Sequence, residues 1–113
     1  MAYDTELAER LRDLLLGEDG LSEKRMFGGL AFLINGNMAV AASSRGGLLL
    51  RCDPDQTATL LGGPHVGPFE MRGREMTGWL RVDPEAVATD EQLQQWVAPA
   101  VAYVRAMQGA EGT

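Results

Sequence analysis

The segment Leu30–Ala42 has the sequence LAFLINGNMAVAA, and it decides the fold class. Its centre, Asn35-Gly36, is the strongest short signal for a β-hairpin, because both residues tolerate the positive φ angles of a type I′ turn. Apolar residues of high strand propensity flank the turn on both sides. The segment therefore predicts two antiparallel strands, residues 30–34 and 37–42, at the centre of a sheet.

Both faces of this predicted hairpin are apolar. A two-residue turn places Leu33 opposite Met38 and then Phe32 opposite Ala39. One face would carry Ala31, Leu33, Met38 and Val40. The other would carry Leu30, Phe32, Ile34, Ala39 and Ala41. An antiparallel sheet with one side in water alternates with polar residues, so each face of this hairpin needs a cover.

Symmetric association is a common way to cover an apolar face, so we expect a homodimer formed through the sheet. The alternative is a monomer in which the helices divide between the two faces. The partner could also be another regulatory protein.

Further short strands and two helices surround the hairpin. Leucines at helical spacing in residues 5–16, followed by Gly17, predict an N-terminal helix. Residues 48–52 predict a third strand, and Asp53-Pro54 opens a short helix that ends near Leu61. The many glycines and prolines of Gly62–Pro68 predict a loop. A second hairpin is expected from residues 68–71 and 76–82.

The last helix begins near Thr89, which forms a possible capping box with Gln92. Its apolar residues recur at helical spacing, namely Leu93, Trp96, Val97, Ala100, Val101 and Val104. Pro99 removes one intrahelical hydrogen bond, so we expect a kink there. The fold class is therefore α+β: a central antiparallel sheet of hairpins flanked by an N-terminal helix, a short middle helix and a longer kinked C-terminal helix.

Length and composition predict one domain. The chain has 113 residues, of which 45% are hydrophobic and 23% charged, as in an ordinary globular protein. We expect a single domain over residues 1–113 with an ordered core of about residues 4–108. No apolar run approaches the ~20 residues of a membrane span. The start lacks signal-peptide features and there is one cysteine, so we expect a cytoplasmic protein without membrane contact.

The sequence predicts no catalytic, metal or cofactor site. Cys52 and His65 are the only residues of their types, and no signature of a cysteine enzyme surrounds either one. They are too few for a structural zinc site. The double glycines match neither the Walker nor the dinucleotide-binding pattern. We therefore expect a non-enzymatic protein, with an enzyme that uses the Gly62–Pro68 loop as one alternative.

A second alternative is nucleic-acid binding. The net charge of −6 disfavours it, but residues 24–81 carry seven basic and four acidic side chains. Arg72, Arg74 and Arg81 lie near Trp79, and arginines beside an aromatic ring can hold single-stranded nucleic acid. The candidate nucleic-acid-binding residues are Arg45, Arg72, Arg74 and Arg81.

An ordered set of motifs carries a family resemblance. These motifs are Arg25-Met26-Phe27-Gly28-Gly29, the hairpin with Gly36 and Met38, Leu50-Arg51-Cys52-Asp53, Pro64…Pro68-Phe69 and the helix after Asp83-Pro84. Over roughly residues 5–107 the chain resembles the TfoX N-terminal domain, found in bacterial competence regulators.

The resemblance implies an α+β domain with an antiparallel sheet and no established enzymatic activity or cofactor. We expect a stand-alone, single-domain member, a regulatory or protein-interaction module whose partner-binding residues are Arg25, Met26, Phe27, Gly28 and Gly29.

Overall fold

The structure is a computed structural model that describes residues 5–26, 29–43, 46–56, 63, 65–71 and 73–111. Helices α1 (Thr5–Leu15) and α3 (Asp90–Glu111) accompany strands β1 (Leu21–Met26), β2 (Gly29–Ile34), β3 (Asn37–Ala42), β4 (Leu48–Arg51), β5 (Val66–Met71) and β6 (Arg74–Val82). Two short 3-10 helices, η1 (Pro54–Gln56) and η2 (Pro84–Val87), follow β4 and β6.

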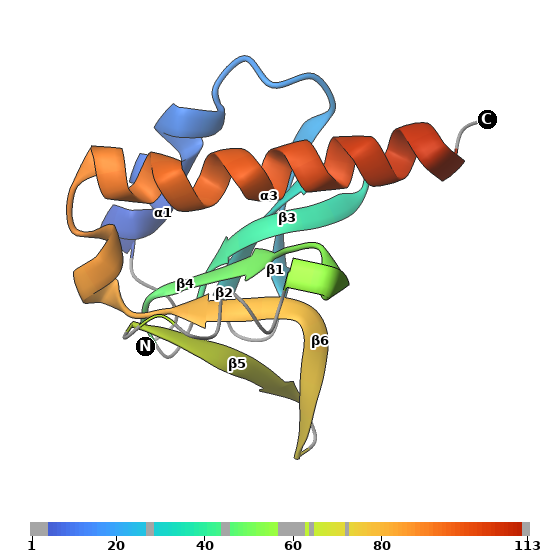
Figure 1. Ribbon diagram of the computed structural model, residues 1–113. Helices are drawn as coiled ribbons and strands as arrows, with labels where there is room; N and C mark the ends of the chain where they lie inside the picture. Colours follow the sequence, from blue (N-terminus) through green and yellow to red (C-terminus); the bar gives the residue numbers. More distant parts are fainter. Residues whose placement is uncertain are drawn as a thin grey trace.

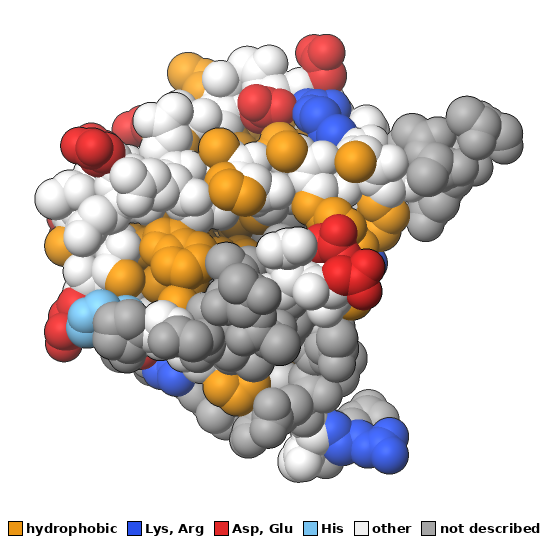
Figure 2. All heavy atoms as spheres, viewed as in Figure 1, with side chains coloured by type: hydrophobic (Ala, Val, Ile, Leu, Met, Phe, Trp, Pro, Cys, Tyr) orange, Lys and Arg blue, Asp and Glu red, His pale blue; other side chains and the backbone are white. Residues whose placement is uncertain are grey.

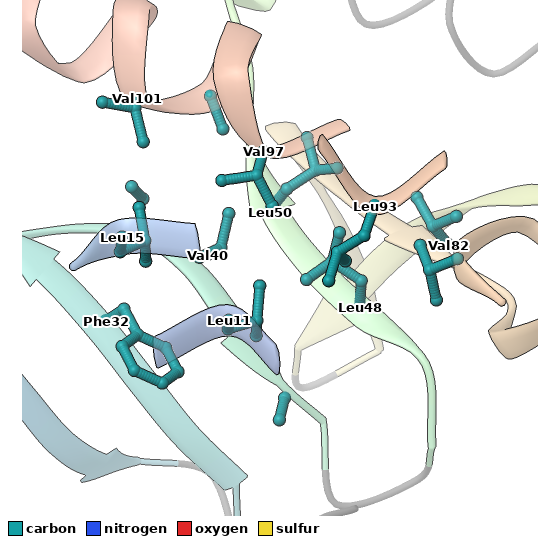
Figure 3. Close-up of a cluster of buried hydrophobic side chains, with 14 of the residues drawn as sticks. Leu11, Leu15, Phe32, Val40, Leu48, Leu50, Val82, Leu93, Val97 and Val101 are labelled. Atoms are coloured by element: carbon teal, nitrogen blue, oxygen red, sulfur yellow. The ribbon is translucent and has the colours of Figure 1, made fainter. Parts of the chain in front are cut away.

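The six strands form one antiparallel sheet in the order β1-β2-β3-β4-β6-β5. Helix α3 lies across one face of it (Figure 1). Side chains of both helices join one buried cluster with that face, so α1 covers the same side. Figure 3 shows Leu11 and Leu15 of α1 and Val97 of α3 around Val40 and Leu50 of the sheet. The predicted α+β class with an antiparallel sheet is confirmed.

The central hairpin forms at the predicted turn, but its register differs from the prediction. Asn35 and Gly36 have φ angles of 51° and 87°, as a type I′ turn requires. Leu33 pairs with Met38, whereas Phe32 pairs with Val40 rather than Ala39. This irregularity adds one residue, Ala39, to β3. It moves Val40 to the helix-covered face, where its side chain is fully buried.

Two other strand predictions are wrong. Strand β1 was not predicted, because its centre, Ser22–Arg25, is polar and exposed. The segment Val66–Pro68 was predicted as loop, yet it begins β5. Strand β5 lies at the edge of the sheet, where Pro68 can be accommodated without losing a central ladder bond.

The predicted middle helix is described only at its start. There Pro54–Gln56 form the 3-10 helix η1, and residues 57–61 lie outside the described part of the chain. The last helix extends through Pro99 to Glu111 as one element.

An ion pair joins α1 to β1. Arg12 donates Nε and Nη2 to the two carboxylate oxygens of Glu23 at 2.7 and 2.8 Å. This hydrogen bonding, opposed by burial, lowers the pKa of Glu23 from its ordinary value. The stabilisation that this ion pair gives the fold is therefore present above the ordinary pKa of glutamate. It is lost as the pH falls through the lowered pKa of Glu23. The pair is largely exposed, so its contribution is small.

The second face of the sheet is buried by the chain itself. Its cluster consists of Ala31, Met38, Ala41 and Leu49, which are 0 to 7% exposed, with Leu33, Phe69 and Trp79 packed against them. Strand β6 bends sharply partway along its length (Figure 1), and Gly78, with a φ of 90°, lies near its middle. Such a bend brings the aromatic residues of the β5–β6 hairpin toward the cluster.

The homodimer expected from the sequence stays a prediction, and the packing of the described side chains on the second face favours its alternative, a monomer. We expect light scattering at micromolar concentration to give a mass near the 12.2 kDa of one chain, because the described apolar side chains of the second face are buried or half-buried. A doubled mass would instead support the dimer. Leu33 is half-buried on that face, so Leu33→Glu should then return the mass to that of one chain.

The predicted capping box forms at the start of α3. The Oγ1 atom of Thr89 accepts a hydrogen bond from the Gln92 N–H at 3.1 Å. In return, Oε1 of Gln92 accepts one from the Thr89 N–H at 3.1 Å. Both bonds satisfy backbone donors that lack partners within the helix.

We expect Thr89→Ala to lower the free energy of unfolding by about 1 kcal/mol, because the capping oxygen is removed. Thr89→Ser keeps that oxygen and should stay close to the wild-type value. Urea denaturation followed by circular dichroism measures both. Equal midpoints for Thr89→Ala and wild type would show that the cap does not stabilise α3.

Candidate binding cleft

A cleft of about 220 Å³ lies between α3 and the segment that leaves β4. Its lining residues are Leu50, Arg51, Cys52, Asp53, Gln56, Gln95, Trp96, Pro99, Ala100 and Tyr103. Leu50, Cys52 and Ala100 are almost fully buried and form its apolar base. Figure 2 shows hydrophobic side chains gathered along the side of α3 that faces the strands.

The helix side of the cleft follows from residue spacing. Gln95, Pro99 and Tyr103 recur every four residues, and Trp96 and Ala100 follow the same interval. Side chains four residues apart lie on one face of a helix, so these five form a single surface.

The strand side follows from alternation and a turn. Leu50 and Cys52 are two residues apart and point to the helix-covered face. The Cys52 N–H donates to the Gly78 carbonyl at 2.8 Å, which keeps the end of this strand beside β6. After it, Asp53 Oδ1 accepts a hydrogen bond from the Asp55 N–H at 2.9 Å. This bond turns the chain into η1 and fixes the open end of the cleft.

Pro99 changes the hydrogen bonding on the helix side. Proline has no N–H, so the carbonyl of Gln95 loses its usual intrahelical donor four residues later. Gln95 and Pro99 both line the cleft. The proline and the glutamine therefore bring a break in the helix hydrogen-bond ladder to the wall of the cleft.

Acidic side chains lie at the rim. Asp53 lines the cleft and Asp55 follows it on η1, where Figure 2 shows acidic side chains. Glu91 is exposed one helical turn before Gln95 on the same face of α3. The basic residue of the lining is Arg51, and its guanidinium carbon lies 5.1 Å from the centre of the Trp79 ring. Trp79 packs on the second face of the sheet, so Arg51 directs its charge there.

The predicted partner-binding residues lie elsewhere. Arg25 is exposed near the end of β1, and Met26 pairs with Gly29 across the start of the first hairpin. Phe27 and Gly28 lie outside the described residues. Of this turn, the described residues Arg25, Met26 and Gly29 are not among those that line the cleft.

The predicted nucleic-acid residues do not form one group within the described chain. Arg74 is exposed at the start of β6, whereas Arg81 is half-buried near its end. Arg45 and Arg72 lie outside the described residues. Arg81 shares the second face with Trp79 and with Arg51, which the sequence did not single out. The Nε atom of Arg81 is buried with no hydrogen-bond partner.

Cys52 and His65 lie far apart. The backbone N–H of Cys52 donates a hydrogen bond to the Gly78 carbonyl, whereas the carbonyl of His65 accepts one from the Asp83 N–H at 2.9 Å. Gly78 and Asp83 are five residues apart along the same chain, which is roughly 16 Å in an extended strand. His65 Nδ1 instead faces Asp83 Oδ2 at 3.7 Å and Glu85 Oε2 at 3.9 Å. The two residues therefore do not form a thiol–imidazole pair.

Among the described residues, no three His, Cys, Asp or Glu side chains are placed to hold a metal ion. The described helices include none with the length and apolarity needed to cross a membrane. The cleft combines an apolar base with the acidic side chain of Asp53. The chain is a small α+β domain with this cleft at the junction of helix and sheet.

The family is shown by comparison with known proteins. The family model for the TfoX N-terminal domain matches residues 13–104, which is most of the 113-residue chain. The chain belongs to the TfoX N-terminal domain family. No curated protein and no solved structure matches it significantly.

Proposed function

We propose that this chain is a non-enzymatic protein-interaction module of the cytoplasm, which holds an apolar side chain of a partner protein in the cleft beside α3. The observation that carries the proposal is the cleft itself. Its apolar base is formed by residues that are almost fully buried, yet it opens beside exposed residues of α3 and η1.

The size of the cleft supports a side chain rather than a metabolite. Sites for drug-sized molecules and cofactors span roughly 300–1,000 Å³. A volume of about 220 Å³ is smaller and suits one large side chain. Energetically dominant residues of protein interfaces are commonly aromatic side chains or arginine that fill such pockets. The half-buried rings of Trp96 and Tyr103 offer further contact area around an inserted group.

The turn Arg25–Gly29 is a second proposed partner contact, supported by the exposure of Arg25. It can add contact area to a cleft-bound partner, since a stable interface buries about 800 Å² on each side and one small cleft supplies only part of that.

Variants on the rim of the cleft test the proposal. Immobilised wild-type protein should retain a specific partner from native lysate, and Tyr103→Ala and Gln95→Arg should each retain about tenfold less of it, because a filled pocket contributes more than 1 kcal/mol. Gln94→Arg makes the same change at the adjacent exposed residue outside the cleft and should behave as wild type. Thermal denaturation confirms that each variant is folded.

Equal retention of the same partner by wild type, Tyr103→Ala and Gln95→Arg would assign the interaction to another surface. Loss of the partner in Arg25→Ala alone would assign it to the turn at residues 25–29.

The rival function, binding of nucleic acid, has one supporting observation. Arg51, Trp79 and Arg81 share the second face of the sheet, and the Nε atom of Arg81 is buried without a hydrogen-bond partner. Opposing it, the chain carries a net charge of −6, and Arg51 already covers one side of the Trp79 ring.

We therefore expect no binding of duplex or single-stranded DNA tighter than about 1 µM at physiological salt, because few phosphate contacts are available. Fluorescence anisotropy measures this directly. Nanomolar binding that weakens with salt, and also weakens on joint replacement of Arg72, Arg74 and Arg81 by alanine, would make nucleic-acid binding the function.

A further inference from the structure

We propose that the side chain held in the cleft beside α3 is apolar and is flanked by lysine or arginine in the partner protein. This inference rests on the proposed function and specifies its ligand: a short basic segment of a partner chain with one large apolar anchor. The acidic side chains at the cleft select for it.

One acidic side chain lines the cleft, and two more are exposed close to its lining residues in sequence. Asp53 and the exposed Asp55 lie where η1 leaves the strand, and Glu91 is exposed on α3 one turn before Gln95. The lining itself contains Asp53 as its acidic residue and Arg51 as its basic residue. The neutral amides of Gln56 and Gln95 make up much of the remaining polar border.

The positive charge of Arg51 does not cancel this field. Arg51 and Trp79 are direct partners across β4 and β6, and the guanidinium lies over the indole ring. That ring belongs to the second face, whereas the base of the cleft belongs to the helix-covered face. The cation is therefore held on the far side of the sheet, and the cleft keeps an acidic surrounding.

Hydrogen bonding is compatible with this ligand. Pro99 lacks the N–H that would donate to the Gln95 carbonyl in a regular helix. A backbone N–H or the side chain of lysine or arginine can donate to this oxygen, whereas a carboxylate cannot. An acidic segment could use its backbone N–H groups in the same way, but it would meet like charge at Asp53 and Asp55.

A second copy of this chain fits less well as the occupant. Each chain carries a net charge of −6, so two copies repel each other at long range. The partner we infer has the opposite charge, and the attraction raises the rate of encounter as well as the affinity.

Synthetic peptides test the inference on the intact chain. Three capped peptides each carry one phenylalanine, flanked on both sides by two lysines, two serines or two glutamates, and a fourth replaces phenylalanine by alanine in the lysine peptide. Each is titrated into isotope-labelled protein and followed by NMR. The lysine–phenylalanine peptide should shift the resonances of Gln95, the Trp96 indole and Tyr103. It should bind roughly fivefold more tightly than the serine peptide, since two exposed charge contacts are gained.

Charge variants locate the effect. Asp55→Asn combined with Glu91→Gln should reduce the preference for the lysine peptide over the serine peptide to about onefold. The matched control, Asp19→Asn combined with Glu85→Gln, removes the same charge from exposed residues outside the cleft and should keep the preference.

Two results would overturn the inference in different ways. If the serine or glutamate peptide binds at the cleft as tightly as the lysine peptide, the cleft still takes an apolar side chain but does not select basic flanks. If no phenylalanine peptide shifts the cleft resonances, or the alanine peptide shifts them equally, the cleft does not bind an apolar anchor and the proposed function fails with it.

Discussion

The packing of α3 on the sheet is the interaction on which the rest of the molecule depends. Leu93, Val97 and Val104 are almost fully buried against the strands, and truncating such a leucine costs about 2–5 kcal/mol. At its other end the helix is held by Arg105, which donates to Glu18 Oε1 at 2.7 Å and to the Asp19 carbonyl at 3.0 Å. The same helix supplies one wall of the cleft, so the geometry of the cleft depends on this packing.

Much of the fold could be predicted because its signals are local. Asn35-Gly36 determines a turn by its own backbone preferences, and Thr89 with Gln92 determines a helix start by two short hydrogen bonds. The register beyond Met38 could not be predicted this way. It depends on the burial of Val40 under the helices. That is a tertiary interaction, and the local preferences of the turn do not determine it. Strand β1 escaped prediction because its centre is polar, and its extended form comes from pairing with β2.

The cleft was beyond the reach of sequence patterns for a related reason. Cys52 and Gln95 are far apart in the chain and become neighbours only when α3 crosses the sheet. Pro99 was noticed as the source of a kink, but its place in the wall of a cleft depends on how α3 lies against the sheet. Arg51 and Trp79 became a pair through the order of the strands, because β6 follows β4 in the sheet although β5 intervenes in the chain.

The two edge strands determine how this sheet behaves toward other chains. An unprotected edge offers unpaired N–H and C=O groups and can recruit further strands into aggregates. Here β1 presents the charged residues Glu23, Lys24 and Arg25 in an exposed row, and β5 contains Pro68, which lacks a donor. Both devices are known to oppose lateral growth of a sheet. Recruitment of other chains through either edge is therefore disfavoured, and the molecule can stay dispersed at high concentration even though apolar residues cover both faces of its sheet.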